Sequence, residues 1–164
     1  SRKKIMAMHT WFECKIRYEK VMENGMQKKV TEPYLVDALS FTEAEARIIE
    51  EMTPFISGEF TVSDIKRANY SELFPSDEES ADRWFKCKLI FITLDEKSGA
   101  EKKTSTQVLV QAADLRDAVK KLDEGMKGTM ADYQIGMVSE TPLMDVYPYS
   151  AEPNDKPEFD PSKA

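Results

Sequence analysis

Apolar and polar residues alternate along the segment near the N-terminus. A period of two is typical of a β-strand that buries one face, and polar or charged residues separate the apolar positions here. The dipeptide Asn24-Gly25 follows, and this pair is strongly favoured at a tight turn between antiparallel strands. The sequence therefore predicts a hairpin whose second strand covers about residues 28–36. The apolar positions of the first strand are Phe12, Cys14, Ile16 and Tyr18.

A helix is expected after this hairpin, and a third strand is expected after the helix. Ser40 and Glu43 have the spacing of a capping box, in which two side chains satisfy backbone N–H groups at the start of a helix. Apolar residues then recur at intervals typical of an amphipathic helix. Strand-like alternation resumes at about residues 59–68. The apolar face expected for the helix consists of Phe41, Ala44, Ile48 and Met52.

The whole pattern occurs twice along the chain. Residues 11–16 read WFECKI, and residues 84–89 read WFKCKL. Matched positions continue through both halves in the same order, with one-residue shifts only in expected loops, where insertions are tolerated. We therefore interpret residues 11–75 and 84–148 as two copies of one ββαβ unit.

These elements predict an α+β fold in which the two copies are related by a pseudo-two-fold axis. We expect a largely antiparallel sheet with both helices on one side. The second copy has Ile90 and Ile92 where the first copy has Arg17 and Glu19, and a strand that is apolar on both faces is covered on both sides. This contrast favours one merged sheet. It also makes the Ile90/Ile92 face a candidate contact with a protein partner or a second subunit.

The ordered part of the chain is expected to form a single globular domain over residues 9–149. Residues 1–8 show no strand or helix pattern, and residues 150–164 are rich in proline, aspartate and lysine. A segment of such composition buries too little apolar surface to offset the entropy of ordering it. Both ends are therefore predicted to be disordered.

Charge and composition exclude several classes of protein. The net charge is −7 and the pI is about 4.9, which disfavours general binding to duplex DNA because such binding depends on clustered positive charge. No apolar run reaches the roughly 18 residues of a membrane-spanning helix, and we expect no secretory signal. The chain has 2 cysteines, too few for a disulfide scaffold, and this favours the reducing cytoplasm.

Three segments of the first copy are similar to segments of a known family. Residues 11–15, 24–36 and 40–47 read WFECK, NGMQKKVTEPYLV and SFTEAEAR. Together with the rest of residues 9–149 they resemble the family catalogued as domain of unknown function 4494, from gut-type anaerobic bacteria and their phages. The resemblance implies a cytoplasmic setting in bacteria or phage infection, and it assigns no activity and no site residues.

Few residues could support catalysis or bind a metal. Cys14 and Cys87 occupy the same repeat position between apolar neighbours, as free cysteines of a core do; the functional alternative is a redox pair or half of a zinc site. Zinc requires four nitrogen or sulfur ligands, and His9 is the only histidine. The sequence contains no nucleophile motif and no phosphate-binding loop. We therefore expect a non-enzymatic protein without metal or cofactor.

One constellation of residues is a candidate ligand site. Each expected first strand carries a tryptophan and basic residues on the face opposite its cysteine, and aromatic rings beside cations can stack on bases and contact phosphates. Alternatively, the tryptophans pack beneath a helix or at the junction of the repeats, and the lysines keep sheet edges from pairing. The candidate residues are Trp11, Lys15, Arg17, Lys28, Lys29, Trp84, Lys86, Lys88, Lys102 and Lys103.

Two hypotheses about function follow. The first is a non-enzymatic binding or adaptor protein. The second is a protein that binds an anionic small molecule or single-stranded nucleic acid through the tryptophan–lysine face. The second hypothesis predicts that both indoles are partly exposed beside the lysines, whereas its alternative predicts that both are buried.

Overall fold

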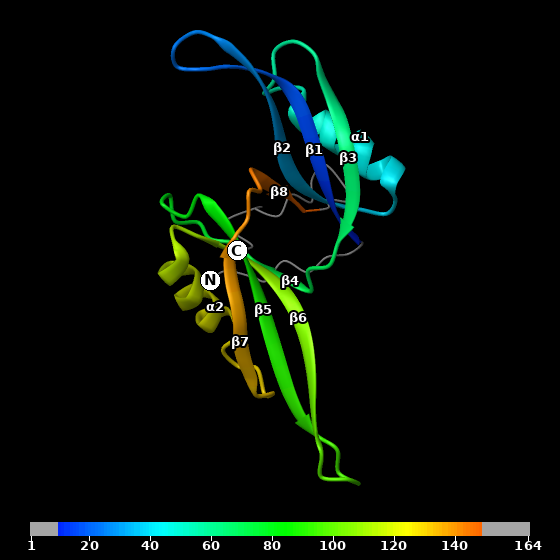
Figure 1. The fold of residues 1–164 in the computed structure, drawn as a ribbon, viewed down its shortest axis with the longest axis vertical. Helices are drawn as coiled ribbons and strands as arrows, with labels where there is room; N and C mark the ends of the chain where they lie inside the picture. The colour runs from blue at the N-terminus through cyan, green and yellow to red at the C-terminus, as the bar shows by residue number, and fades with distance from the viewer. Residues whose placement is uncertain (1–9, 149–164) are drawn as a thin grey trace, which may run out of the picture. The chain divides into compact units, whose positions relative to one another are not determined.

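The computed structural model describes residues 10–148, which divide into two compact units. Unit 1 contains residues 10–69 and 142–148, and unit 2 contains residues 70–141. Each unit is a four-stranded sheet with a helix on one face (Figure 1). The two ends predicted to be disordered lie outside the described residues.

Unit 1 is built mainly from the first copy. Its sheet has the strand order β3–β1–β2–β8, and β1 is antiparallel to both of its neighbours. Helix α1 buries Ala44 and Ile48 against the sheet face that carries Phe12 and Cys14. The elements are β1 (Thr10–Val21), β2 (Gln27–Ala38), α1 (Phe41–Met52), β3 (Phe60–Ala68) and β8 (Asp145–Tyr147).

Unit 2 repeats this arrangement with the second copy. Its sheet has the order β4–β6–β5–β7, and β5 is antiparallel to both of its neighbours. Helix α2 buries Ala118 and Leu122 on the sheet face that carries Cys87. The elements are β4 (Glu72–Phe74), β5 (Arg83–Leu94), β6 (Glu101–Ala112), α2 (Leu115–Gly125) and β7 (Tyr133–Glu140).

The structure confirms the α+β fold and the duplicated order of strands and helix. Equivalent residues also hold equivalent registers, since Cys14 lies opposite Ile65 and Cys87 lies opposite Val138. The expectation of one merged sheet is wrong, because the copies build two separate four-stranded sheets. Ile90 and Ile92, whose apolar character suggested a merged sheet, are only half-buried.

Each copy ends in a short strand that pairs with the sheet of the other copy. Strand β8, at the end of the second copy, runs parallel to β2 of the first copy and places Val146 opposite Leu35. Strand β4, at the end of the first copy, runs parallel to β6 of the second copy and places Leu73 opposite Leu109. All four side chains are buried. The repeat is therefore ββαββ, and its last strand is exchanged.

The length of one connection explains why the strand is exchanged. To pair with β2 of its own sheet as β8 does, Glu72 would have to lie opposite Tyr34, on the far edge of the sheet from β3. Measured from Ala68 at the end of β3, that position lies three strand spacings across the sheet, about 14 Å. It also lies about 10 Å back along the direction of β3, because Ala68 is level with Asp37, three residues from Tyr34. From Ala68 to Glu72 an extended chain spans only about 14 Å. The first copy therefore cannot close its own sheet.

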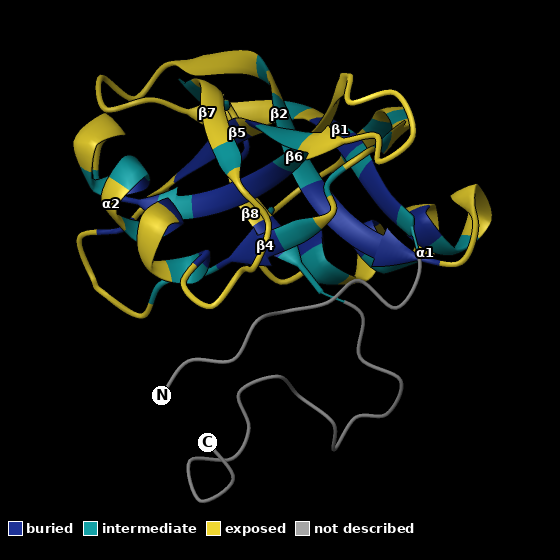
Figure 2. Cartoon of the chain, turned by 90° about the horizontal axis from the view of Figure 1, so that it is seen from below, coloured by how far each residue is buried: buried dark blue, intermediate teal, exposed yellow. Residues whose placement is uncertain are grey.

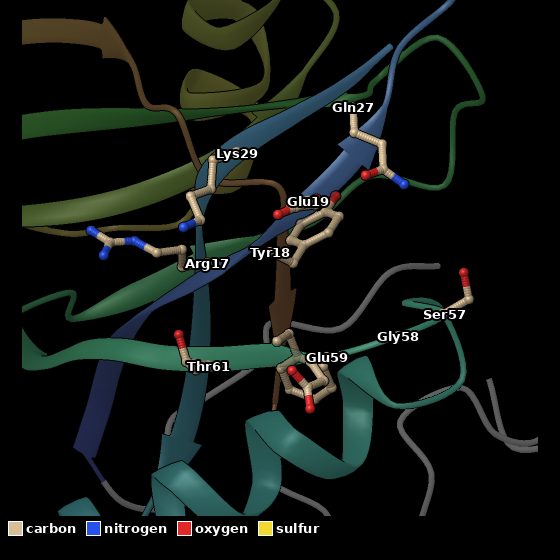
Figure 3. Close-up of a pocket in the computed structure, with 10 residues that line it drawn as sticks. Arg17, Tyr18, Glu19, Gln27, Lys29, Ser57, Gly58, Glu59 and Thr61 are labelled. Carbon is tan, nitrogen blue, oxygen red and sulfur yellow. The ribbon is translucent and has the colours of Figure 1, made fainter. Parts of the chain in front are cut away.

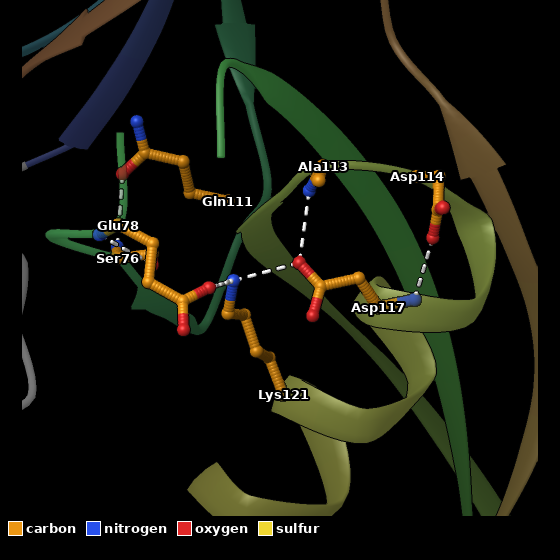
Figure 4. Close-up of polar contacts among 7 residues, drawn as sticks. All are labelled: Ser76, Glu78, Gln111, Ala113, Asp114, Asp117 and Lys121. Atoms are coloured by element: carbon orange, nitrogen blue, oxygen red, sulfur yellow. Dashed lines mark hydrogen bonds and ion pairs between the residues drawn. The ribbon is translucent and has the colours of Figure 1, made fainter. Parts of the chain in front are cut away.

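Both helices begin with a capping box, and the one predicted at Ser40 and Glu43 is confirmed. In α1, Glu43 N donates to Ser40 Oγ at 3.1 Å, and Leu39 N donates to Glu43 Oε1 at 2.6 Å. In α2, Asp117 N donates to Asp114 Oδ1, and the carboxylate of Asp117 accepts from the backbone of the residue before the cap (Figure 4). The short polar side chain at each N-cap satisfies backbone donors that a helix leaves free.

A basic residue on each helix holds the segment that follows the exchanged strand. Lys121 Nζ lies 2.6 Å from Glu78 Oε1 and 2.7 Å from Asp117 Oδ2 (Figure 4). In unit 1, Arg47 stands at the equivalent helix position and donates to the carbonyl oxygen of Pro148 at 3.0 Å. The ion pair with Lys121 lowers the pKa of Asp117. The stability that the Lys121–Asp117 ion pair contributes is therefore present at neutral pH, and it is lost as the pH falls through the lowered pKa of Asp117.

Each unit buries residues where the helix covers the sheet and also around its tryptophan on the outer face, whereas the ends of the long hairpins are exposed (Figure 2). Val21 and Met26 flank the β1–β2 turn with 64% and 67% of their surfaces exposed, and Leu94 at the end of β5 is 68% exposed. Apolar side chains therefore meet solvent at the hairpin ends, as they also do at turn and loop positions such as Phe55 and Met130.

Candidate functional site

The two tryptophans of the predicted ligand site are buried. Trp11 is 2% exposed and Trp84 is 5% exposed. Trp11 lies between Asp37 of β2 and Ala68 of β3, and Trp84 lies opposite Gln111 of β6. The expectation of exposed rings that stack on bases is therefore wrong. The indoles are part of the packed interior, as the alternative interpretation predicted.

Strand alternation divides the predicted lysine pairs between two faces. Lys28 lies opposite Lys20, which shares the helix-facing side of β1, whereas Lys29 lies opposite Glu19 on the outer side. In the second copy, Lys103 lies opposite Ile92 on the outer side, and its neighbour Lys102 is on the helix side. Adjacent residues of a strand point to opposite faces. Only one lysine of each pair therefore joins the tryptophan face.

On the outer face of unit 1, acidic and basic residues alternate across the strands. Lys15 lies opposite Asp64, and Glu13 lies opposite Lys66. Opposite charges at facing positions of a sheet stabilise the pairing of the strands. Lys15 and Lys66 therefore each face a carboxylate across the strands, whereas Arg17 lies opposite Thr31 and Thr61.

The equivalent positions of unit 2 carry no such carboxylates. Lys86 lies opposite Ser139 and Lys88 lies opposite Met137. Further along β5, Ile90 and Ile92 point to the same side, because alternate residues of a strand share a face. Lys88 and Lys103 are exposed, Met137 is 41% exposed, and the two isoleucines are half-buried. We name this surface the basic–apolar face; it consists of Lys86, Lys88, Ile90, Ile92, Lys103 and Met137.

A bulge in β7 shapes the basic–apolar face. The register between β5 and β7 shifts between Lys88 and Leu89, and Gly136 is the extra residue. A Cβ atom at Gly136 would lie 2.9 Å from Cδ1 of Ile90, closer than two carbon atoms can pack. Glycine therefore allows the Ile90 side chain to lie over the edge strand. No local pattern in the sequence distinguishes Gly136 or Met137, although the repeat places Met137 where the first copy has Asp64.

A pocket of about 660 Å³ opens in unit 1 and contains two of the predicted ligand residues, Arg17 and Lys29 (Figure 3). The carboxylates of Glu19 and Glu59 also line it, so its charge is mixed. Tyr18 contributes its ring, and its hydroxyl donates to Glu32 Oε1 at 2.8 Å. Burial, followed by this hydrogen bond, raises the pKa of Tyr18 to about 12. The remaining lining residues are Gln27, Ser57, Gly58, Phe60 and Thr61.

The two cysteines are free and fully buried in the cores of their units. Burial raises the pKa of Cys14 to about 12 and that of Cys87 to about 11. Burial therefore disfavours the thiolate, which is the form of cysteine that acts as a nucleophile or metal ligand. His9 lies outside the described residues.

Within residues 10–148, no group of three or more His, Cys, Asp or Glu side chains is arranged to hold a metal ion. Over the same part of the chain, neither helix has the length and apolar character needed to cross a membrane.

The chain was compared with known proteins at the level of family, sequence and structure. No curated protein and no solved structure matches it. The model of the family described as Domain of unknown function (DUF4494) matches residues 10–149, which include every strand and helix of both units. The chain therefore belongs to the DUF4494 family.

Proposed function

We propose that the chain is a non-enzymatic binding or adaptor protein that contacts a protein partner through the basic–apolar face of unit 2. The observation that carries this proposal is the exposure of apolar side chains on a sheet surface that no helix of its unit covers. Met137 is 41% exposed beside half-buried Ile90 and Ile92. Contiguous exposed apolar surface is typical of a site of protein interaction.

The proposed setting is the cytoplasm of a bacterium, or of a bacterium infected by a phage. The two cysteines are free and buried. This supports a location in a reducing compartment, because disulfides persist mainly in oxidising ones. The bacterial or phage origin rests on the resemblance stated for the sequence.

Site-specific photo-crosslinking tests the adaptor proposal. A photoreactive residue is placed at Met137 and, as a control, at Met130, which is 97% exposed but outside the basic–apolar face. In cells of the source organism we expect discrete crosslinked species from position 137 and none of the same mass from position 130, measured by immunoblot and mass spectrometry. A second copy of the chain in the adduct indicates a homo-oligomer. Identical results from the two positions contradict the proposal.

A second candidate function is binding of an anionic small molecule in the unit 1 pocket. Arg17 and Lys29 line this pocket with the hydroxyls of Ser57 and Thr61, and pockets of about 300–1,000 Å³ are the usual size for small ligands. We expect a nucleoside phosphate or an inorganic phosphate to raise the melting temperature of the chain, and R17Q/K29Q to abolish the shift. The control is Lys28→Gln, at an exposed neighbouring position outside the pocket. Equal shifts in both variants refute this function.

A further inference from the structure

The outer faces of the two copies differ in charge, although they share one register. Position by position, Glu13 of the first copy is replaced by Lys86, Asp64 by Met137, and Glu19 by Ile92. At each of these three positions unit 2 lacks a carboxylate that unit 1 carries.

The outer face of unit 2 also lacks two cations of the first copy, because Ile90 replaces Arg17 and Ser139 replaces Lys66. Its remaining charges are nevertheless mainly positive, because Lys86, Lys88 and Lys103 are present while the three carboxylates are lost. No ion pair involves Lys86, Lys88 or Lys103 within residues 10–148.

We propose that the basic–apolar face docks an extended, acidic segment of a partner protein. The inference rests on the adaptor function proposed above and names the chemistry of the partner. The chain as a whole carries a net charge of −7. A local group of cations without ion-pair partners is therefore opposite in sign to the net charge of the protein. Complementary charge across an interface selects partners and guides their approach.

The order of residues along β5 indicates the order of residues in the partner segment. Lys86, Lys88, Ile90 and Ile92 follow one another on one face, separated by about 7 Å each, the spacing of alternate residues in a strand. An extended peptide has the same spacing on each of its own faces. A segment with two acidic residues followed by two aliphatic residues at alternate positions therefore matches this strand.

A protein segment fits this face better than a single-stranded nucleic acid does. Proteins that bind single strands stack the bases on exposed aromatic rings, and the tryptophan on this face, Trp84, is 5% exposed. The apolar groups at this surface are instead non-aromatic, at half-buried Ile90 and Ile92 and at exposed Met137. Aliphatic side chains gain free energy mainly by burying apolar surface of a partner, which a peptide side chain supplies.

The test measures binding of a labelled peptide with the sequence Glu-Ser-Glu-Ser-Leu-Ser-Leu by fluorescence anisotropy. We expect saturable binding that weakens as salt is raised, because screening reduces attraction between exposed charges. Replacing glutamate by lysine in the peptide should abolish binding, and replacing leucine by serine should weaken it. A single-stranded oligothymidylate of similar charge is measured in parallel.

Two charge-reversal variants separate this face from general electrostatics. K88E/K103E changes two exposed lysines of the basic–apolar face, and K28E/K29E makes the same change at exposed positions of unit 1. We expect the first pair to weaken peptide binding at least about tenfold, since like charges then face each other, and the second pair to change it less than about twofold. Circular dichroism checks that both variants are folded.

Three results would contradict the proposal that the partner segment is acidic. They are equal loss in both variants, no binding of the peptide, and tighter binding of the oligothymidylate than of the peptide. If crosslinks from position 137 persist in K88E/K103E, the adaptor function stands and only the acidic chemistry of the partner is wrong. If position 137 also gives no crosslinks when Lys88 and Lys103 are unchanged, the proposed adaptor function is contradicted.

Discussion

Replacing Trp84 by alanine is expected to lower the free energy of unfolding by about 3–5 kcal/mol, the usual cost of removing a buried tryptophan from a core. The side chain is 5% exposed, so the surrounding residues would border a cavity. The carbonyl group of Trp84 would keep its hydrogen bonds from N and Oγ1 of Thr141, at 2.8 and 2.9 Å. The loss therefore reports packing of the indole.

Chemical denaturation with circular dichroism measures this loss. Leu94→Ala is the control, because Leu94 is 68% exposed, and its cost should lie within about 0.5 kcal/mol, as for most surface changes. Trp11→Ala should behave like Trp84→Ala, since Trp11 is 2% exposed. A loss below about 1 kcal/mol for both tryptophans would show that the indoles are not part of the core.

Replacing Leu73 by alanine is expected to destabilise unit 2 by about 2–5 kcal/mol, although Leu73 belongs to the first copy. Leu73 is fully buried in β4 and lies opposite Leu109 of β6. The carbonyl oxygen of Gln107 in β6 accepts from Ser71 N beside β4, so the backbone of Leu109, two residues further along, also faces β4. Loosening β4 should therefore accelerate amide hydrogen exchange at Leu109. Amides of β1 in unit 1 should exchange at the rate of the unmodified protein.

A matched substitution reverses the pattern. Val146 is 8% exposed in β8, at the equivalent position of the second copy, and it lies opposite Leu35 of β2. Val146→Ala should therefore accelerate exchange at the edge of β2 and leave β6 unchanged. If either variant instead affects the sheet of its own copy, the strands are not exchanged in solution.

The sequence predicted much of the secondary structure because its signals are local. Alternating residues around Cys14 and Cys87 indicated strands, and the capping box at Ser40 indicated the start of the first helix. Each signal acts within a few residues along the chain, so it survives in any tertiary context that buries the apolar face. The internal repeat strengthened these interpretations, because the same order was found twice.

Placement of the candidate site was less predictable, because exposure depends on residues distant in sequence. Trp11 and Lys15 lie on one side of one strand in any interpretation, but β2 and β3 determine that the indole is buried. Likewise, only the pairing of β5 with β7 shows that Lys88 faces Met137, whereas Lys15 faces a carboxylate. The difference between the two outer faces is therefore a property of the strand register.

The sequence alone determined the α+β class, the duplication, the helix caps and the buried positions of both cysteines. Only the tertiary structure decided that the copies form two sheets and that each lends its last strand to the other. The physical reason is the connection between β3 and β4, which is too short to carry Glu72 back across its own sheet. Periodicity shows that a strand forms, whereas chain length and sheet geometry decide which neighbour it can reach.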